Sequence, residues 1–380
     1  MSDRNPRISR RRLLEAAGGI TFLALAPNGR GAFAANFAGA VDATAPDPAL
    51  PIFTALPYLQ PGPASALVEG GESIVIAWQT DLRPAEFAVT VDGDAVVGAP
   101  ARTTRQTGTD DGEGRFNYAV TIGGLALGAK RYRYRVAMNG RRLAEGYFTT
   151  RKRRGQATRF VAFGDNSFGE VSDRMIAYQT YQARPDFVMN TGDNVYENGL
   201  DDEYARYFFP VYNSNIAEIR TGAPLLRSVP FYTVIANHDV HGKGPDKGPA
   251  ADFDKSPDAL AYYTAMHLPL NGPAAPSHAT PAIGDADAIV AFRAAAGARF
   301  PRMANYSFDY GDAHFLCLDA NVYVDPTNAA LQAWIEADLT ARRAPHGSSS
   351  SFIIRASMSA RSTTQSNTCA RFRRSSRSTG

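Results

Sequence analysis

Three polar positions in the middle of the chain have the residue types and the setting for metal-dependent chemistry. Asp165, Asp193 and the pair Asn237-His238 each follow a short apolar stretch that is typical of a β-strand. If these strands are parallel neighbours, their carboxyl ends meet at one edge of a sheet. Carboxylate and amide oxygens with an imidazole suit a pair of metal ions, which can clamp the attacking and leaving oxygens of a phosphoryl transfer. The pattern therefore predicts a phosphoester hydrolase in which His238 protonates the leaving group.

Simpler interpretations of the same residues exist. An Asp after a strand is often only the N-cap of a helix, and Tyr196 taken alone is more typical of a core aromatic. His314 lies within an apolar strand, so we expect a packed core histidine, and we expect Cys317 to be a small buried hydrophobe. No Gly-rich GxxxxGK[ST] phosphate loop occurs in the chain. The ordered set of polar strand ends still favours a metal site over these alternatives.

Alternating strands and helices must position these residues. The apolar pattern predicts strands at 158–163, 185–190, 231–235 and 314–318, helices near 170–183 and 328–342, and a further strand that begins near Phe352. Polar residues at the strand ends are typical of an α/β sheet with its site on that edge. Residues 241–305 are rich in Gly and Pro, and we expect an insertion over one edge of the sheet.

An all-β module precedes the α/β region. Period-two alternation predicts strands at 73–80, 87–91, 117–122 and 132–136. Four dipeptides are predicted to form turns: Asp92-Gly93, Asp111-Gly112, Gly123-Gly124 and Asn139-Gly140. The pattern predicts a β-sandwich that serves as a scaffold. Four residues in it resemble the tyrosine-corner region of a fibronectin type III domain: Leu125, Gly128, Tyr132 and Tyr134.

The order of the motifs makes the resemblance to a family specific. Gly164-Asp165, Gly192-Asp193-Asn194-Val195-Tyr196 and Asn237-His238-Asp239 follow a β module in this order. This order resembles the purple acid phosphatases of the calcineurin-like metallophosphoesterase superfamily. Two further stretches look like the family's entry sequence and later core strands: Pro57-Tyr58-Leu59-Gln60 and Tyr306–Gly311 with His314-Phe315. The likeness covers roughly residues 55–350.

The resemblance implies a role for each site residue. Asp165 would bind a first metal, Fe(III), and Tyr196 would bind it as a phenolate. Asp193 would bridge to a second, divalent ion (Zn, Fe or Mn), which Asn237 would bind through its amide oxygen. His238 would act beside the leaving group as acid or phosphate ligand. The substrate would be a small phosphate monoester, attacked by a hydroxide held on the binuclear centre.

Two positions depart from the usual pattern of relatives. Ser167 stands where many relatives without the tyrosine ligand have a metal-binding histidine, which fits a first site that uses Tyr196. Ala236 replaces the Gly that usually precedes Asn-His, and a Gly at that position would relieve crowding.

The ends of the chain have their own composition. Residues 9–14 read Ser-Arg-Arg-Arg-Leu-Leu, and a short apolar run and an Ala-rich cleavage site follow, which is typical of a twin-arginine export signal over 1–35. The alternatives are an ordinary basic N-terminus or a membrane anchor. We expect a periplasmic or secreted protein with no stable membrane association after cleavage. Without residues 1–35 the chain has 34 basic and 35 acidic residues, which argues against nucleic-acid binding.

The C-terminal stretch does not fit the resemblance. The family would require three more metal-binding histidines, yet no His follows His346. The last 26 residues contain six Arg, seven Ser and four Thr and no Asp, Glu or Lys, a composition that cannot build a core. We interpret residues 355–380 as an out-of-frame or truncated end, with a natural disordered tail as the alternative. Three missing ligands would leave this chain with poor hydrolytic activity.

The resulting prediction is a multidomain chain: an all-β, fibronectin III-like sandwich and an αββα-type metallophosphoesterase domain that is incomplete at its C-terminus. We divide it into a signal (1–35), a linker (36–55), the sandwich (56–150), the metallophosphoesterase domain (158–354) and the tail (355–380). The alternative functions are a phosphodiesterase of the same superfamily and a catalytically inactive binding protein. The oligomeric state and the particular ester stay open.

Overall fold

A computed structural model gives the structure of the chain and describes residues 22–23, 50–95, 100–105, 114–240, 250–275, 279–341 and 350–355. Most of the expected signal, most of the linker, the Asp111-Gly112 turn and the tail after Arg355 lie outside these residues. Within the described ranges, no helix is long and apolar enough to cross a membrane.

The part of the described chain between Phe53 and Thr149 forms two antiparallel four-stranded sheets. One sheet contains, in spatial order, β2 (Phe53–Gln60), β3 (Glu72–Thr80), β7 (Arg115–Leu125) and β6 (Ala101–Arg105). The other contains β5 (Asp94–Ala95), β4 (Phe87–Val91), β8 (Arg131–Met138) and β9 (Arg141–Thr149). Trp78 of β3 stacks on Tyr118 of β7 in a core that both sheets share. The strands predicted from alternation are therefore confirmed.

Two local expectations for this region were wrong. Gly123-Gly124 lie inside β7, where the register with β3 shifts by one residue, so they form a β-bulge and no turn. Gly124 has φ +70°, the left-handed conformation that such a bulge favours. β2 begins at Phe53, inside the range that we assigned to the linker, because Phe53 already pairs with Thr80 of β3.

β3 connects the sandwich to the rest of the molecule. All nine of its residues are buried, although its alternating sequence would suit a strand with one exposed face. Ile74, Ile76 and Trp78 lie in the core of the sandwich. Val75 and Ala77 lie in a second, larger core that the α/β region forms. Both faces of this strand are thus covered, one by each core.

A parallel sheet follows the sandwich. It contains β10 (Phe160–Phe163), β11 (Phe187–Asn190) and β12 (Phe231–Thr233), which lie side by side and run in the same direction. Helix α2 (Val171–Ala183) connects β10 to β11. Short helical segments connect β11 to β12: α3 (Asp201–Glu203), η1 (Tyr204–Phe208), α4 (Phe209–Tyr212) and η2 (Leu225–Arg227). β12 ends two residues before the predicted boundary.

The outer edge of β10 is covered by part of the expected signal. Phe22–Leu23 form the short strand β1, which pairs antiparallel with Val161 and Ala162. The sequence analysis treats residues 1–35 as a signal that takes no part in the fold. In the structure, Phe22 and Leu23 are nevertheless part of the sheet. An exposed strand edge is a ready partner for such an apolar segment.

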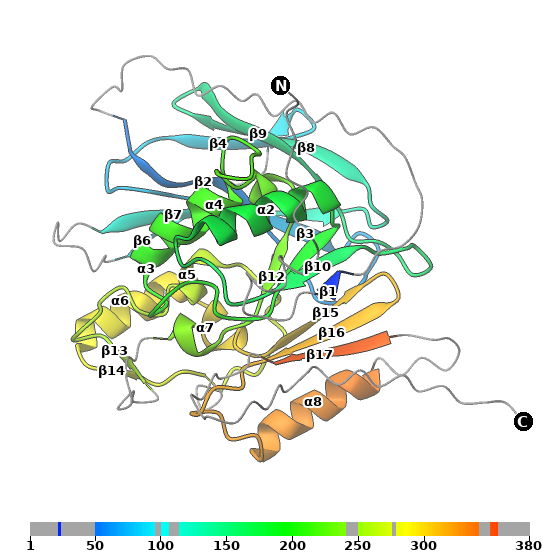
Figure 1. Cartoon of the computed structure of the whole chain (residues 1–380), viewed down its shortest axis with the longest axis vertical. Helices are drawn as coiled ribbons and strands as arrows, with labels where there is room; N and C mark the ends of the chain where they lie inside the picture. The colour runs from blue at the N-terminus through cyan, green and yellow to red at the C-terminus, as the bar shows by residue number, and fades with distance from the viewer. Residues whose placement is uncertain are drawn as a thin grey trace, which may run out of the picture.

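A second sheet packs against the first through aromatic rings. It contains β15 (Tyr306–Tyr310), β16 (Ala313–Leu318) and β17 (Ser350–Arg355), with β16 and β17 parallel. The ring centroid of Phe315 lies 5.4 Å from that of Phe160 and 5.4 Å from that of Phe187, both edge to face. Helix α8 (Ala329–Ala341) lies beside this sheet, at the end of the molecule opposite β8 and β9 (Figure 1). The described chain is thus a mixture of several sheets and helices.

The predicted insertion packs against the end of β12. Its described part forms β13 (Ala251–Asp252), α5 (Tyr262–Ala265), β14 (Ala282–Ile283), α6 (Ala286–Ala296) and α7 (Arg299–Arg302). The hydroxyl of Tyr262 donates to the carbonyl of Thr233 at 2.8 Å, at the last residue of β12. The insertion therefore contacts the sheet next to the loop that carries Asn237 and His238.

Candidate functional site

Three loops at the carboxyl edge of the parallel sheet carry the residues selected from the sequence. Asp165 follows β10, and Asp193 and Tyr196 follow β11. Asn237 and His238 lie in the 3-10 turn η3 (Asn237–Asp239) that follows β12. Because the three strands are adjacent and parallel, their following loops lie at the same edge.

Tyr196 joins the two carboxylates. Its hydroxyl oxygen lies 3.0 Å from Asp165 Oδ1 and 3.0 Å from Asp193 Oδ2. The hydroxyl has a single proton, so it donates fully to only one carboxylate at a time. The side-chain oxygens of Asp165, Asp193 and Tyr196 therefore lie close together and share one hydroxyl proton. Such an oxygen-rich cluster is chemically suited to a hard cation.

The electrostatics of the cluster favour the protonated forms of Asp193 and Tyr196. Burial raises the pKa of Asp193, and the Asp165 charge raises it further, against the opposing effect of the His238 backbone N–H and side chain. Burial, followed by the charges of Asp193 and Asp165, raises the pKa of the Tyr196 phenol far above its usual range. A cation bound here would offset the repulsion between these oxygens, and ligation by the phenolate would release a proton.

The backbone at the two aspartates is left-handed. Asp165 has φ +53° and Asp193 has φ +50°, a conformation that Asp tolerates better than most residues. The N–H of Asp165 donates to the carbonyl of Gly192 at 3.1 Å, and the N–H of Asn166 donates to the carbonyl of Asp193 at 3.2 Å. A Cβ at Gly164 would lie only 3.0 Å from the Gly192 carbonyl oxygen. The two loops are therefore fixed against each other by their main chains.

His238 lies on the other side of Asp193. Its backbone N–H donates to Asp193 Oδ1 at 2.9 Å, and its ring centroid lies 4.2 Å from that of Tyr196. Its Nδ1 lies 3.1 Å from the carbonyl oxygen of Glu197. A carbonyl only accepts, so Nδ1 is the donor in this bond, which leaves Nε2 as the nitrogen that can exchange a proton with a ligand.

Asn237 presents an unsatisfied oxygen. Its Oδ1 is buried and has no hydrogen-bond partner among the described residues. Burying a hydrogen-bond acceptor without a partner costs free energy. A hard cation bound to Asn237 Oδ1 would remove this cost. The preceding Ala236 has φ −128° and ψ −172°, an extended conformation that any residue adopts. An alanine at this position therefore causes no backbone strain.

A network of buried polar residues behind the site was not assigned from the sequence. Asp239 accepts hydrogen bonds from the backbone N–H groups of Asn194 and Ala236, each at 2.9 Å, and from the Asn194 side chain at 3.0 Å. Asn190 donates to Asn166 at 2.9 Å. These contacts connect the loops that follow all three parallel strands.

The sequence did contain a signal for this network. An Asn follows directly after both Asp165 and Asp193, and Asp239 completes the Asn237-His238-Asp239 motif. The repeat indicated that these neighbours share a role, although it gave no indication of which atoms meet. Ser167 is buried and accepts a hydrogen bond from the Asn166 side chain at 3.0 Å.

The candidate metal donors are two aspartates, one tyrosine and one asparagine amide. Among the residues that the structure describes, no group of three or more His, Cys, Asp or Glu side chains could hold a metal ion. The tyrosine and asparagine oxygens are therefore required for a site here. The donor set is made of hard oxygens, which fits Fe(III) and divalent ions such as Mn.

Other histidines in the described ranges lie away from this cluster. His314 is buried in β16 between Asp309 and Asp338, with both nitrogens 2.7 Å from a carboxylate oxygen. His267 is in contact with Arg299 at 3.0 Å. His241, His278 and His346 lie outside the described residues. Cys317 is fully buried, as predicted.

Comparison with known proteins gives one partial similarity. Over 88 residues the chain is 33% identical to purple acid phosphatase 17 of Arabidopsis thaliana. The match covers 22% of this chain and 24% of the length of that protein. No family model matches the chain. The similarity supports a relationship to the phosphatases.

Proposed function

We propose that this chain is a metal-dependent phosphatase that hydrolyses phosphate monoesters. The observation that carries the proposal is the contact of the Tyr196 hydroxyl with the carboxylates of Asp165 and Asp193 at the ends of neighbouring parallel strands. The partial similarity to a protein named as a purple acid phosphatase supports the class of reaction.

Four residues would hold the binuclear centre. Asp165, Asp193 and Tyr196 would bind Fe(III), and Asn237 with Asp193 would bind a divalent ion. Asp193 is suited to serve both, because Oδ2 faces Tyr196 while Oδ1 faces the η3 turn that contains Asn237. When bound, such a pair supplies Lewis-acid activation of the phosphoryl group and of the attacking water.

His238 would supply the proton for the leaving group. The bond from Nδ1 to the Glu197 carbonyl fixes the ring orientation and leaves Nε2 to donate. The partly exposed position of this side chain gives the ester oxygen access to it. Asp193 also accepts a hydrogen bond from the backbone N–H of His238. One carboxylate would therefore both bind the metal ions and position the residue that acts as the acid.

The surroundings of the site complete the proposal. The two antiparallel sheets would be a fibronectin III-like scaffold (56–150), and the later sheets a metallophosphoesterase domain (158–354). One contact supports the first assignment: the N–H of Ala126 donates to the hydroxyl of Tyr132 at 3.2 Å, as in a tyrosine corner. Residues 1–35 would direct export by the twin-arginine route to the periplasm or beyond. The partner would be a small phosphate ester.

Activity measurements on the whole chain test this function. The purified chain is loaded with iron and zinc and assayed with an aryl phosphate monoester and the matching diester. We expect slow, metal-dependent hydrolysis of the monoester. Asp193→Asn should reduce it to the level without added metal, because it removes the shared ligand. Asp312→Asn, which changes an exposed carboxylate bonded to the Gly155 N–H, is the control.

The other outcomes distinguish the alternatives. Faster hydrolysis of the diester would identify a phosphodiesterase. Metal binding without hydrolysis of either ester would favour an inactive binding protein. Monoester hydrolysis that Asp193→Asn leaves unchanged would contradict the proposed site.

A further inference from the structure

Phe168 has an unusual position beside the candidate site. Its ring stacks on Tyr196, with centroids 3.7 Å apart and ring planes 19° apart. His238 lies 4.2 Å from the same ring. At these distances the two neighbours must occupy opposite faces of Tyr196. The tyrosine ring is therefore sandwiched, and its hydroxyl is directed to Asp165 and Asp193.

Phe168 contributes little to a hydrophobic core. The residue is 48% exposed, whereas Tyr196 beneath it is only 9% exposed. An exposed phenylalanine is not required for folding, because burial of apolar surface is what stabilises a core. Its main packing consequence is to cover one face of Tyr196. A substitution of Phe168 can therefore be studied in a folded protein.

The loop that presents Phe168 is held in place by its own backbone. Ser167 and Gly169, on either side, have φ of +66° and +85°. The carboxylate of Asp173, in the first turn of α2, accepts a hydrogen bond from the backbone N–H of Glu170 at 3.0 Å. This buried carboxylate thus ties the end of the loop to the helix.

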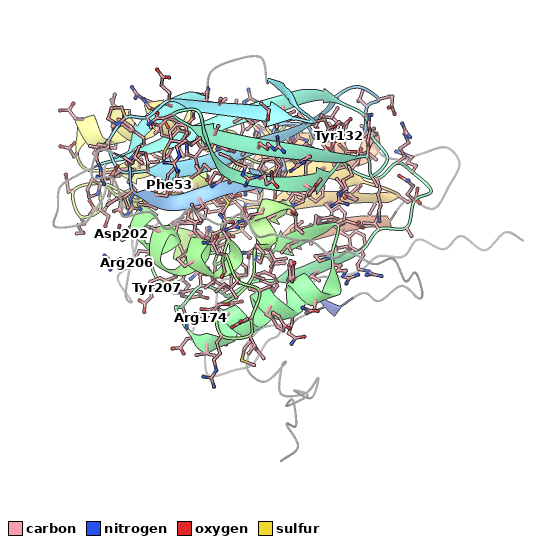
Figure 2. The ribbon with its side chains drawn as sticks, turned by 90° about the horizontal axis from the view of Figure 1, so that it is seen from above. Phe53, Tyr132, Arg174, Asp202, Arg206 and Tyr207 are labelled. Carbon is pink, nitrogen blue, oxygen red and sulfur yellow. The ribbon has the colours of Figure 1, made fainter. Side chains whose placement is uncertain are left out.

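Tyr207 of η1 restricts the loop from the other side. A Cβ at Gly169 would lie 2.9 Å from the ring of Tyr207, so only glycine fits this approach. Tyr207 and Arg174 of α2 lie on the same side of the molecule (Figure 2). The loop is fixed from both sides, and its one exposed aromatic residue is aimed at Tyr196.

We infer that Phe168 is a positioning residue for Tyr196. It holds the phenol ring against His238 with its oxygen toward the two aspartates, and it keeps water from the covered face. This inference rests on the proposed function, because it concerns Tyr196 as a metal ligand. Phe168 itself contacts the ring and acts only through it.

The consequence is a change in iron binding when the stack is removed. An aromatic pair of this kind contributes about 0.5–1.5 kcal/mol, which corresponds to roughly 2- to 12-fold in a binding constant. Only the part of this stacking energy that differs between the iron-free and the iron-bound chain changes the affinity, so Phe168→Ala should weaken Fe(III) binding by up to that factor. The visible tyrosinate–Fe(III) band should lose intensity per bound iron and move to shorter wavelength, because water then reaches the phenolate.

The experiment compares four proteins as full chains. Fe(III) is titrated into wild type, Phe168→Ala, Phe168→Tyr and Val171→Ala, and the visible spectrum is recorded at each step. Phe168→Tyr retains the stack and should restore the wild-type band. Val171→Ala removes another exposed apolar side chain, 51% accessible and three residues further along, and should change nothing. Thermal unfolding of each protein establishes that all four are folded.

The outcomes separate this inference from the function on which it rests. A wild-type band that Phe168→Ala leaves unchanged in position, intensity and affinity overturns the positioning role alone. A wild-type chain that shows no visible band with Fe(III) overturns both, because Tyr196 is then not a ligand. A loss of the band in Val171→Ala as large as in Phe168→Ala also overturns the specific role of Phe168.

Discussion

Among individual residues, Tyr196 contacts four of the residues at the candidate site. Its hydroxyl serves two carboxylates, and its ring lies between Phe168 and His238. These contacts come from the loops that follow all three parallel strands, so the position of Tyr196 depends on the whole of this sheet edge. It is therefore the residue at which a test of the metal site is most direct.

Tyr196→Phe removes the hydroxyl and leaves the ring stack. We expect the iron-loaded variant to have no visible tyrosinate band, because no phenolate remains to bind the metal. Absorption spectra of iron-loaded wild type and variant measure this. Tyr207→Phe, which alters a tyrosine near the same loop, should retain the band. A band of full intensity in Tyr196→Phe would show that the colour comes from another ligand.

Asp239 is the residue on which the backbone of two site loops depends. Asp239→Ala leaves the N–H groups of Asn194 and Ala236 buried without an acceptor. Each such group costs about 1–3 kcal/mol, so we expect the free energy of unfolding to fall by roughly 2–6 kcal/mol. Urea denaturation measures it. Asp252→Ala, which breaks a surface pair with Lys255, should leave the free energy of unfolding close to that of wild type. Equal effects of the two substitutions would contradict the role of Asp239.

Among the elements, α8 is attached to the second sheet through a buried histidine. His314 of β16 contacts Asp309 of β15 and Asp338 of α8, both at 2.7 Å. Burial disfavours its charged form, but the hydrogen bonds that its ring donates to these two carboxylates outweigh burial and raise the pKa of His314. Ser307 extends the contact by donating to Asp338 at 2.6 Å. The attachment of α8 should therefore depend on pH.

His314→Gln tests this dependence. Since the pKa of His314 is raised in the folded chain, its contribution is fully present below the unfolded value of about 6.5 and is lost as pH rises through the folded pKa. We expect the variant to be less stable by about 3–5 kcal/mol at pH 5.5 and by clearly less at pH 9. Denaturation curves at several pH values measure the difference. A difference that stays constant or grows with pH would refute the assignment.

In the molecule as a whole, the sandwich and the α/β region are joined by buried contacts. β3 contributes to both cores, and Arg151 lies at the junction. Its guanidinium pairs with Glu72 of β3 at 2.8 Å and donates to the carbonyl of Asp309 in β15 at 3.2 Å. Both side chains of the pair are about 95% or more buried. We therefore expect the two parts to unfold together.

Arg151→Met would leave the Glu72 carboxylate buried without its cation. Such a loss costs about 3–5 kcal/mol, so we expect a large fall in melting temperature with a single transition retained. Arg153→Met is the matched control, because its pair with Glu69 is more than half exposed and contributes about 0–1 kcal/mol. Calorimetry measures both. Two separate transitions in the wild type would contradict the joint unfolding.

Local patterns in the sequence determined where the strands and the main helices lie. Strands β3, β4 and β8 follow from period-two alternation, and α2 and α8 lie within one or two residues of their predicted bounds. These features are local, because side-chain direction repeats along a strand or helix whatever surrounds it. The Gly123-Gly124 bulge was missed for the same reason, since a bulge is defined by the pairing strand.

The tertiary structure alone decided which residues meet. Asp165 and Tyr196 are 31 positions apart, and only the parallel order of β10 and β11 brings their oxygens to 3.0 Å. Phe168 and Asp239 acquire their roles from contacts across loops, and the covered second face of β3 depends on a core formed by residues far along the chain. The sequence determined the chemistry that each side chain can perform. The topology determined the distances, because contacts between segments far apart in sequence depend on strand order and direction, which local periodicity does not specify.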